Sequence, residues 1–114
     1  MILLIDNDPD TLEMTSLFFE HLGFEVKSSG QLIPLTDIIE VNPELVIVDY
    51  LLNGSFGSTL CTEIKQHPKT QHIPVVVFSA LNSVEEIAKK SGADDFIYKP
   101  FDLKQFEQKI RRLL

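Results

Sequence analysis

Residues 45–49 read LVIVD, in which four apolar residues run directly into a carboxylate. A short, continuous apolar run predicts a strand that is covered on both faces, as strands of a parallel sheet are. The arrangement recurs, and each run ends at residues that can carry chemistry: ILLI (2–5) at Asp6 and Asp8, VVVF (75–78) at Ser79, and FIY (96–98) at Lys99. LVIVD is therefore one instance of a pattern that organises the whole chain.

Amphipathic segments alternate with these apolar runs. They are predicted as helices at 9–22, 31–41, 58–66, 84–90 and 102–114, and residues 24–28 alternate in polarity as an edge strand does. Five strand–helix units of this kind predict an α/β fold. We expect a three-layer α/β/α sandwich around a five-stranded parallel sheet, with strand order 2-1-3-4-5.

Local signals place several helix ends and turns. Asp8-Pro9 is expected to cap the first helix, because a carboxylate there can accept from the free N–H groups of the first turn. Gly23 and Gly92 are expected to follow helices in the left-handed conformation. Asn53-Gly54 is expected to form a turn after Asp49, since both residues accept left-handed backbone angles.

The residues at the strand ends are expected to form one site. In a parallel sheet the carboxyl ends of the strands share an edge, and ligands collect there, where the strand order reverses. Carboxylates suit a divalent cation, which prefers hard oxygen ligands, while a hydroxyl and an ammonium suit phosphoryl oxygens. The sequence therefore predicts a site for a metal ion and a phosphoryl group at this edge.

Size and charge exclude several classes of protein. The 114 residues fit one domain, and a single cysteine, Cys61, cannot form a disulfide within the chain, which is typical of a reduced cytoplasmic environment. A formal charge of −7, with only ten lysines and arginines, argues against direct nucleic-acid binding. The apolar start MILLI ends at Asp6, too early for a signal peptide, and no stretch is long enough to cross a membrane. We expect a soluble cytoplasmic protein.

Four stretches in a fixed order resemble one protein family: ILLIDNDPD (2–10), PELVIVDYLLNGSFG (43–57), PVVVFSA (74–80) and GADDFIYKPF (92–101). Together they make the chain resemble the receiver domain of two-component response regulators, the CheY-like family. The resemblance implies a flavodoxin-like fold and a signalling domain rather than an enzyme, one that assists only its own phosphorylation and dephosphorylation. It implies that Asp49 is the phosphoacceptor, which takes a phosphoryl group from a sensor histidine kinase or a histidine phosphotransfer protein. Residues 1–114 are then a single receiver domain, with no output domain in this chain.

The resemblance also implies a Mg²⁺ or Mn²⁺ site formed by Asp6, Asp49 and the backbone carbonyl of Leu51. Asn7 stands where the family usually has a second carboxylate. An amide oxygen can bind a cation but brings no negative charge, so we expect weaker metal binding than is usual in the family. Asp8 could add charge through a water molecule, although capping of the first helix is its expected role.

Ser79, Lys99 and Phe96 complete the set that the resemblance implies. The Ser79 hydroxyl would bond a phosphoryl oxygen beside the small Ala80, and Lys99 would neutralise phosphoryl charge, with a cis Lys99–Pro100 peptide bond. Phe96 would be the switch aromatic, turning inward as Ser79 moves toward the phosphoryl group. The surface that changes is the one formed by the fourth helix, fifth strand and fifth helix, where we expect a downstream protein to bind.

Two other readings of the chain stay open at this point. Asn7 motivates a receiver-like interaction module that binds partners without phosphorylation. A flavin-binding or hydrolytic enzyme on the same architecture fits less well, because the acidic segment DNDPD (6–10) would repel a bound phosphate without a metal. In any of these cases we expect a monomer or a weak homodimer.

Overall fold

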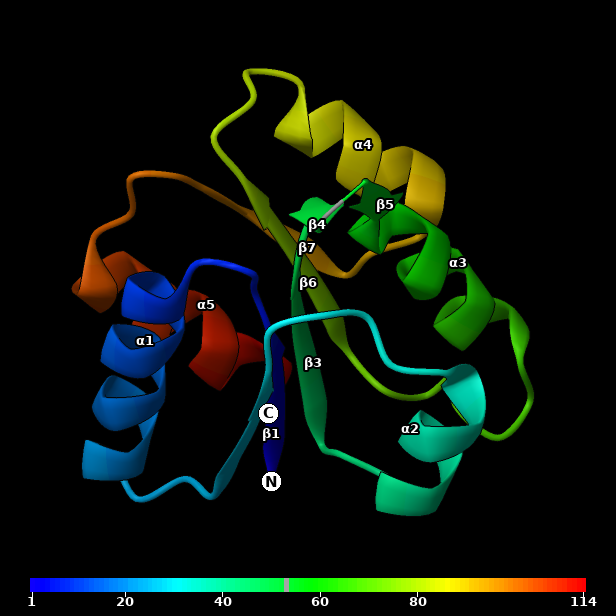
Figure 1. Cartoon of the computed structure of the whole chain (residues 1–114), viewed down its shortest axis with the longest axis horizontal. Helices are drawn as coiled ribbons and strands as arrows, with labels where there is room; N and C mark the ends of the chain where they lie inside the picture. Colours follow the sequence, from blue (N-terminus) through cyan, green and yellow to red (C-terminus); the bar gives the residue numbers. More distant parts are fainter. Residues whose placement is uncertain (53) are drawn as a thin grey trace.

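The computed structural model describes residues 1–52 and 54–114, and in them a five-stranded parallel sheet lies between two layers of helices (Figure 1). The strands of this sheet are β1 (Ile2–Ile5), β2 (Val26–Ser29), β3 (Leu45–Asp49), β6 (Val75–Ser79) and β7 (Asp95–Tyr98). The helices are α1 (Pro9–His21), α2 (Leu35–Val41), α3 (Gly57–Gln66), α4 (Val84–Ser91) and α5 (Leu103–Leu113). The predicted three-layer α/β/α sandwich is confirmed.

The strand order is β2-β1-β3-β6-β7. A short antiparallel pair, β4 (Leu51–Leu52) with β5 (Ser55–Phe56), stands apart from this sheet and was not predicted. Without it the order reads 2-1-3-4-5, as predicted, and β2 lies at an edge, as its alternating sequence indicated. The order reverses at β1, which pairs with both β2 and β3.

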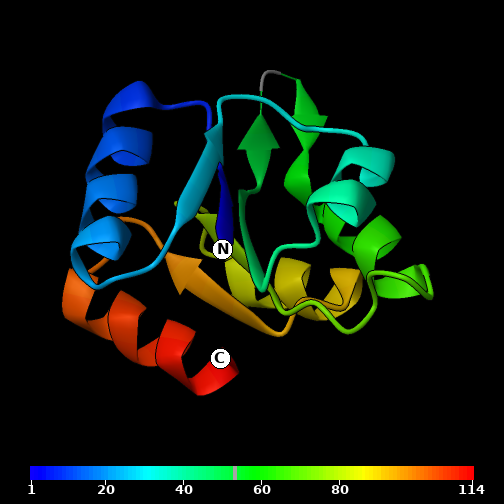
Figure 2. The same cartoon turned by 90° about the horizontal axis from the view of Figure 1, so that it is seen from below.

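The core consists of two hydrophobic clusters, one on each face of the sheet. Successive strand residues face opposite sides, so Leu3 and Ile5 join one cluster while Ile2 and Leu4 join the other. The first cluster packs under α2, α3 and α4, and the second under α1 and α5. Figure 2 shows these two groups of helices on opposite sides of the sheet. The apolar runs are therefore covered on both faces, which is why they lack alternation.

Edge-to-face phenylalanines fix α5 against the sheet and α1. The ring centroid of Phe106 lies 5.2 Å from that of Phe19 and 4.9 Å from that of Phe101. Such pairs add about 1 kcal/mol each beyond the burial of their area. Phe78 of β6 contacts both Phe101 and Phe106, so the aromatic cluster extends to the strand that carries Ser79.

Element boundaries follow local chemistry, and two predicted starts, those of α2 and β2, were wrong by two residues or more. Helix α2 begins at Leu35 rather than at residue 31, because Pro34 adopts an extended conformation as its N-cap. At α1 the predicted cap is confirmed: Asp8 accepts from the Asp10 N–H at 3.3 Å and from the Thr11 hydroxyl at 2.6 Å. The Thr11 hydroxyl holds the pKa of Asp8 below its usual value.

The glycine predictions are also confirmed. Gly23 and Gly92 have φ of +95° and +82°. Gly54 has φ of +85°, while Asn53, its predicted partner in the turn, lies outside the described residues. The predicted strand at 24–28 begins instead at Val26, because Phe24 still closes the end of α1 by donating its N–H to the Phe19 carbonyl.

Gly57, the first residue of α3, packs directly against the end of β3. A Cβ atom there would lie 2.0 Å from the Asp49 carbonyl oxygen and 2.8 Å from a methyl of Val48. The Gly57 N–H donates to the Tyr50 carbonyl at 2.7 Å. The start of α3 therefore lies so close to the backbone of Asp49 that only a residue without a side chain fits at position 57.

We predict that Gly57→Ala lowers the free energy of unfolding by about 1–3 kcal/mol, because the backbone carbonyl of Asp49 cannot move aside without disturbing β3. Urea denaturation measures the change. Gly30→Ala is the matched control, since its added Cβ would have no neighbour closer than 3.9 Å, and its effect should stay within about 0.5 kcal/mol. Equal effects of the two substitutions would contradict the close-approach argument.

Candidate functional site

Three of the predicted residues meet at the carboxyl edge of the sheet. The Lys99 ammonium lies 3.0 Å from Asp6 Oδ2 and 3.3 Å from Asp49 Oδ2. Asp6 follows β1, Asp49 ends β3 and Lys99 follows β7, so strands distant in sequence supply one cluster. The prediction that these strand-end residues lie close together is confirmed by these contacts.

Lys99 is held in place from several directions. Its ammonium lies 4.3 Å from the centroid of the Phe78 ring, a cation–π contact, and its side chain is 20% exposed. Its backbone N–H donates to the Ser79 carbonyl at 2.9 Å, and the Lys99–Pro100 peptide bond is cis, as predicted. The contact of Phe78 with Lys99 was not predicted from the sequence. The feature that could have indicated it is an aromatic residue immediately before Ser79, at the end of the strand.

Asp6 is fully buried and uses both carboxylate oxygens. Oδ2 accepts from Lys99, and Oδ1 accepts from the Asp8 N–H at 2.9 Å. The second contact ties Asp8, the N-cap of α1, to the end of β1. Asp8 therefore serves the helix, in agreement with its expected role.

Asp49 is only 8% exposed and lies between an ammonium and a second carboxylate. Burial raises the pKa of its carboxyl group most, Lys99 lowers it and the Asp6 carboxylate raises it, so that the pKa stands at about 6. The negative charge of Asp49 is thus only partly balanced by its surroundings. A cation or an added electrophile would relieve this unfavourable state.

The donor set suits a hard divalent cation, although it is short of negative charge. Asp6 and Asp49 offer carboxylate oxygens, and Leu51, in β4, offers a backbone carbonyl two residues beyond Asp49. Asn7 is exposed and follows Asp6 in the chain, and its amide oxygen is the neutral donor that the sequence predicts for a cation. Among residues 1–52 and 54–114, no group of three His, Cys, Asp or Glu could hold a metal ion. A cation at this edge would depend on neutral oxygens, which fits Mg²⁺ or Mn²⁺ bound weakly.

Ser79 lies at the same edge, at the end of β6, and is 4% exposed. Its hydroxyl oxygen accepts from the Leu81 N–H at 3.1 Å, which orders the turn before α4. Ala80 next to it is exposed and small, which leaves access to the edge. Ser79 thus lies at the predicted strand end, its hydroxyl oxygen is bonded within the turn, and its role toward a phosphoryl group stays a prediction.

Phe96 lies in β7, away from the three charged residues. Its ring is half-buried against the cluster under α3 and α4, and its backbone N–H donates to its neighbour Asp95 at 2.8 Å. Phe96 is thus linked to Lys99 along the backbone, because it lies in β7 three residues before that lysine.

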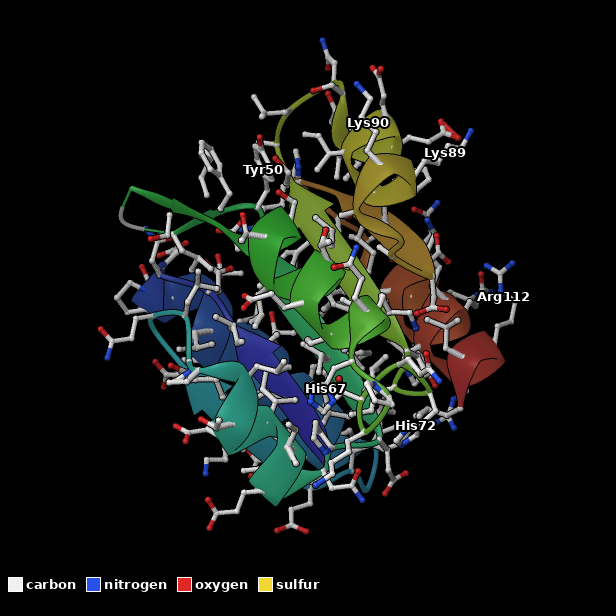
Figure 3. The ribbon with its side chains drawn as sticks, turned by 90° about the vertical axis from the view of Figure 1, so that its right-hand side faces the viewer. Tyr50, His67, His72, Lys89, Lys90 and Arg112 are labelled. Atoms are coloured by element: carbon white, nitrogen blue, oxygen red, sulfur yellow. The ribbon has the colours of Figure 1, made fainter. Side chains whose placement is uncertain are left out.

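The histidines lie elsewhere, and Cys61 is structural. Figure 3 shows His67 and His72 at the opposite end of the molecule from Tyr50, the residue after Asp49. Cys61 is fully buried, contacts the Ser91 carbonyl at 3.6 Å, and burial raises the pKa of its thiol.

Comparison with known proteins identifies the family. Residues 2–111 match the family model described as the response regulator receiver domain. The chain is 31% identical over 120 residues to the DNA-binding dual master transcriptional regulator RpaA of Synechocystis, covering 99% of this chain and 48% of that protein. The receiver domain of NtrX from Brucella abortus superposes with a TM-score of 0.87 at 32% identity, covering 100% of this chain and 98% of that one.

The fold is also shared with TrrA from Thermotoga maritima, a response regulator whose structure was solved in complex with Mg²⁺ and BeF. The TM-score is 0.88 at 23% identity, covering 99% of this chain and 97% of that one.

The chain belongs to the response regulator receiver domain family, whose function is phosphorelay signal transduction. The predicted family, fold and signalling function are confirmed, and the comparisons give no support to a phosphorylation-independent interaction module. The chain spans about half the length of the curated relatives RpaA and MtrA that it matches, at 48% and 50%. No helix within residues 1–52 and 54–114 has the length and apolar content needed to cross a bilayer.

The raised pKa of Asp49 predicts a pH-dependent effect of Asp49→Asn in metal-free buffer. Because the folded state binds this proton more tightly than the unfolded state, Asp49 favours folding below the ordinary pKa of 3.8, and this contribution is lost as pH rises through about 6. Solvent at the exposed edge of the carboxyl reduces the full effect. We expect Asp49→Asn to gain about 1–2 kcal/mol relative to the wild type between pH 4.5 and pH 7.5. Urea titrations at a series of pH values test this, and a stability difference that does not vary with pH would contradict it.

Proposed function

We propose that Asp49 accepts a phosphoryl group from a phosphohistidine on a sensor kinase or a histidine phosphotransfer protein. The observation that carries the proposal is the Lys99 ammonium, which lies 3.3 Å from Asp49 and 3.0 Å from Asp6. It places positive charge beside a carboxylate that is largely ionised near neutral pH, because its pKa is about 6.

The transfer needs one bond formed and one broken. A carboxylate oxygen of Asp49 attacks phosphorus in line with the phosphorus–nitrogen bond of the donor. That bond breaks, the imidazole nitrogen leaves with the electron pair, and the product is an acyl phosphate on Asp49. Water later hydrolyses the acyl phosphate and restores the carboxylate. The protein contributes position and charge rather than a covalent intermediate of its own.

Neighbouring residues would stabilise the phosphoryl oxygens. The Lys99 ammonium, which lies between the two carboxylates, can bind one phosphoryl oxygen. The Ser79 hydroxyl can donate to another after its hydrogen bond with the Leu81 N–H breaks. Asp6, Asp49, the Leu51 carbonyl and Asn7 would hold Mg²⁺ or Mn²⁺, which neutralises phosphoryl charge when bound.

The output is proposed to pass through the surface formed by α4, β7 and α5, which contains Phe96. Movement of Ser79 toward a phosphoryl group and of Phe96 toward the core would change this surface and its binding of a downstream protein. These 114 residues are proposed to be one receiver domain, cytoplasmic and monomeric or weakly dimeric. RpaA is described as DNA-binding, which weakens the expectation of no nucleic-acid contact for the whole protein, although the charge of −7 still argues against it for these residues.

We predict that acetyl phosphate adds one phosphoryl group to this chain in the presence of Mg²⁺. Asp49→Asn should gain none, because it lacks the attacking oxygen. Lys99→Met should slow the gain at least tenfold, since the ammonium no longer balances the phosphoryl charge. Intact mass spectrometry over time measures both. Phosphorylation of Asp49→Asn, or full activity without a divalent cation, would overturn the proposed site.

Lys69→Met is the control for loss of a lysine. Lys69 is exposed in the segment between α3 and β6, and its substitution should leave the rate unchanged. A similar loss in both lysine variants would show that overall charge, rather than the position of Lys99, governs the reaction.

Asn7→Asp should increase the affinity for Mg²⁺ by about tenfold or more, because a carboxylate beside Asp6 adds a negative charge close to the cation. Calorimetric titration of the unphosphorylated protein measures the dissociation constant. Asn42→Asp adds the same charge at the left-handed C-cap of α2, at the opposite edge of the sheet, and should change the affinity little. Unchanged binding in Asn7→Asp would remove residue 7 from the metal site.

A further inference from the structure

Lys109 of α5 makes a set of contacts with β7 that the family resemblance did not predict. Its ammonium donates to the Phe96 carbonyl at 2.6 Å and lies 3.3 Å from the Asp95 carboxylate. Asp95 in turn accepts from the Phe96 N–H at 2.8 Å. One ammonium therefore fixes both backbone polar groups of Phe96, one of them directly and the other through Asp95.

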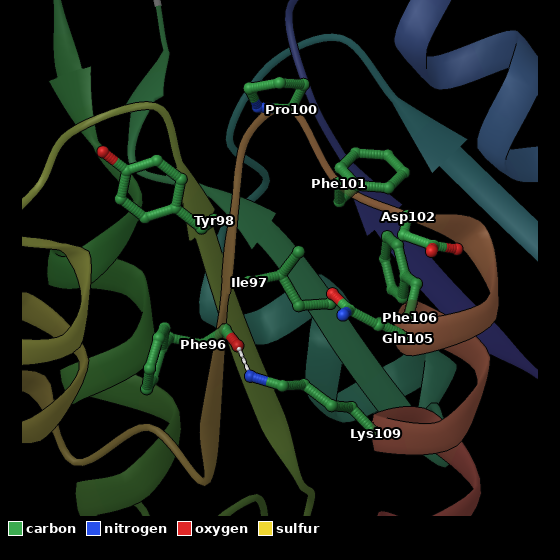
Figure 4. Close-up of a pocket in the computed structure, with 9 residues that line it drawn as sticks. All are labelled: Phe96, Ile97, Tyr98, Pro100, Phe101, Asp102, Gln105, Phe106 and Lys109. Atoms are coloured by element: carbon green, nitrogen blue, oxygen red, sulfur yellow. Dashed lines mark hydrogen bonds between the residues drawn. The ribbon is translucent and has the colours of Figure 1, made fainter.

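The same ammonium also lies over the Phe96 ring, 4.3 Å from its centroid. Phe96 packs with the cluster under α3 and α4, whereas α5 packs on the opposite face of the sheet. Lys109 thus reaches past β7, which is the last strand in the sheet order, to meet a ring on the other side (Figure 4). The carbonyl contact alone would allow many ring orientations, but the cation–π contact is made only with the ring as it stands.

The contacts of Lys109 with β7 are partly shielded from solvent, which strengthens them. The Lys109 and Asp95 side chains are 26% and 25% exposed, so the ammonium is partly withdrawn from water. A surface pocket of about 150 Å³ lies beside Lys109 between β7 and α5, lined in part by Ile97, Gln105 and Phe106 (Figure 4). Because the Gln105 side of this pocket is exposed, the Lys109 side chain has space in which to change its conformation.

We propose that Lys109 is a positioning residue that holds Phe96 in its present orientation and couples the position of α5 to that of the ring. The inference rests on the proposed function, in which Phe96 turns when Asp49 is phosphorylated. Turning the ring would break the cation–π contact, and the ammonium would then hold only the backbone of β7. Lys109 therefore opposes the switch, and its release transmits the movement of Phe96 to α5.

The test follows the Phe96 ring itself by ¹⁹F NMR of protein labelled with 4-fluorophenylalanine. Phe96→Leu assigns the resonance by its disappearance. Spectra of the wild type, Lys109→Met, Lys109→Arg and Lys104→Met are compared before and after treatment with acetyl phosphate and Mg²⁺. Lys109→Met keeps most of the aliphatic stem and removes the charge, while Lys109→Arg keeps a cation that stacks on aromatic rings. Lys104 is an exposed lysine on the same helix and serves as the matched control.

We expect Lys109→Met to move the Phe96 resonance in the unmodified protein and to shift the ring equilibrium toward the phosphorylated position by about fivefold. Lys109→Arg should retain most of the wild-type position, and Lys104→Met should match the wild type. The resonance of Phe19, which is buried in α1, should stay in place, which shows that the fold is intact.

Failure of this inference and failure of the proposed function give different results. A Phe96 resonance that Lys109→Met leaves unmoved, in a chain whose Asp49 is phosphorylated normally, would overturn the role of Lys109 alone. Absence of phosphorylation in the wild type would overturn the proposed function. The spectra of the unmodified proteins would still show whether Lys109 positions the ring.

Discussion

The arrangement at the sheet edge depends on one ammonium that lies between two poorly hydrated carboxylates. Asp6 is fully buried and Asp49 nearly so, and without Lys99 their mutual repulsion would have little to oppose it. The three residues come from β1, β3 and β7, so the electrostatic balance requires these strands to keep their relative positions. The two apolar clusters provide that rigidity, because each strand is packed on both faces.

Asn7 changes the balance of charge at this edge. With Asp6, Asp49 and Lys99 the local charge is −1, whereas a carboxylate at position 7 would make it −2. The smaller charge reduces repulsion in the metal-free protein and at the same time weakens the attraction for a cation. If a cation binds at this edge as proposed, Asn7 lowers the affinity for it and also lowers the repulsion in the metal-free protein. The raised pKa of Asp49 shows that compensation is still incomplete.

The sequence predicts this fold well wherever burial determines it. Continuous apolar runs identify β1, β3 and β6, and the topology then brings Asp6, Asp49 and Lys99 together. What it could not predict depends on packing between distant elements: the reach of Lys109 to Phe96 depends on the rotation of α5. The pairing of Leu51 with Phe56 joins two strands of two residues each, which are too short to leave a periodic signal in the sequence. Pro34 could have indicated that α2 begins at Leu35, but the helix was predicted to begin at residue 31.

The separation along the chain between Asp6 and Lys99 has a consequence during synthesis. Their contact spans 93 residues, and Lys99 follows the last strand of the sheet to be made. A nascent chain that has folded β1 and β3 around their helices still holds two carboxylates with no ammonium between them. The charged edge of the sheet is thus completed only when β7 has left the ribosome and joined the sheet. If Asp49 accepts a phosphoryl group as proposed, an unfinished chain lacks the ammonium that would balance the added charge and should accept that group more slowly than a finished molecule.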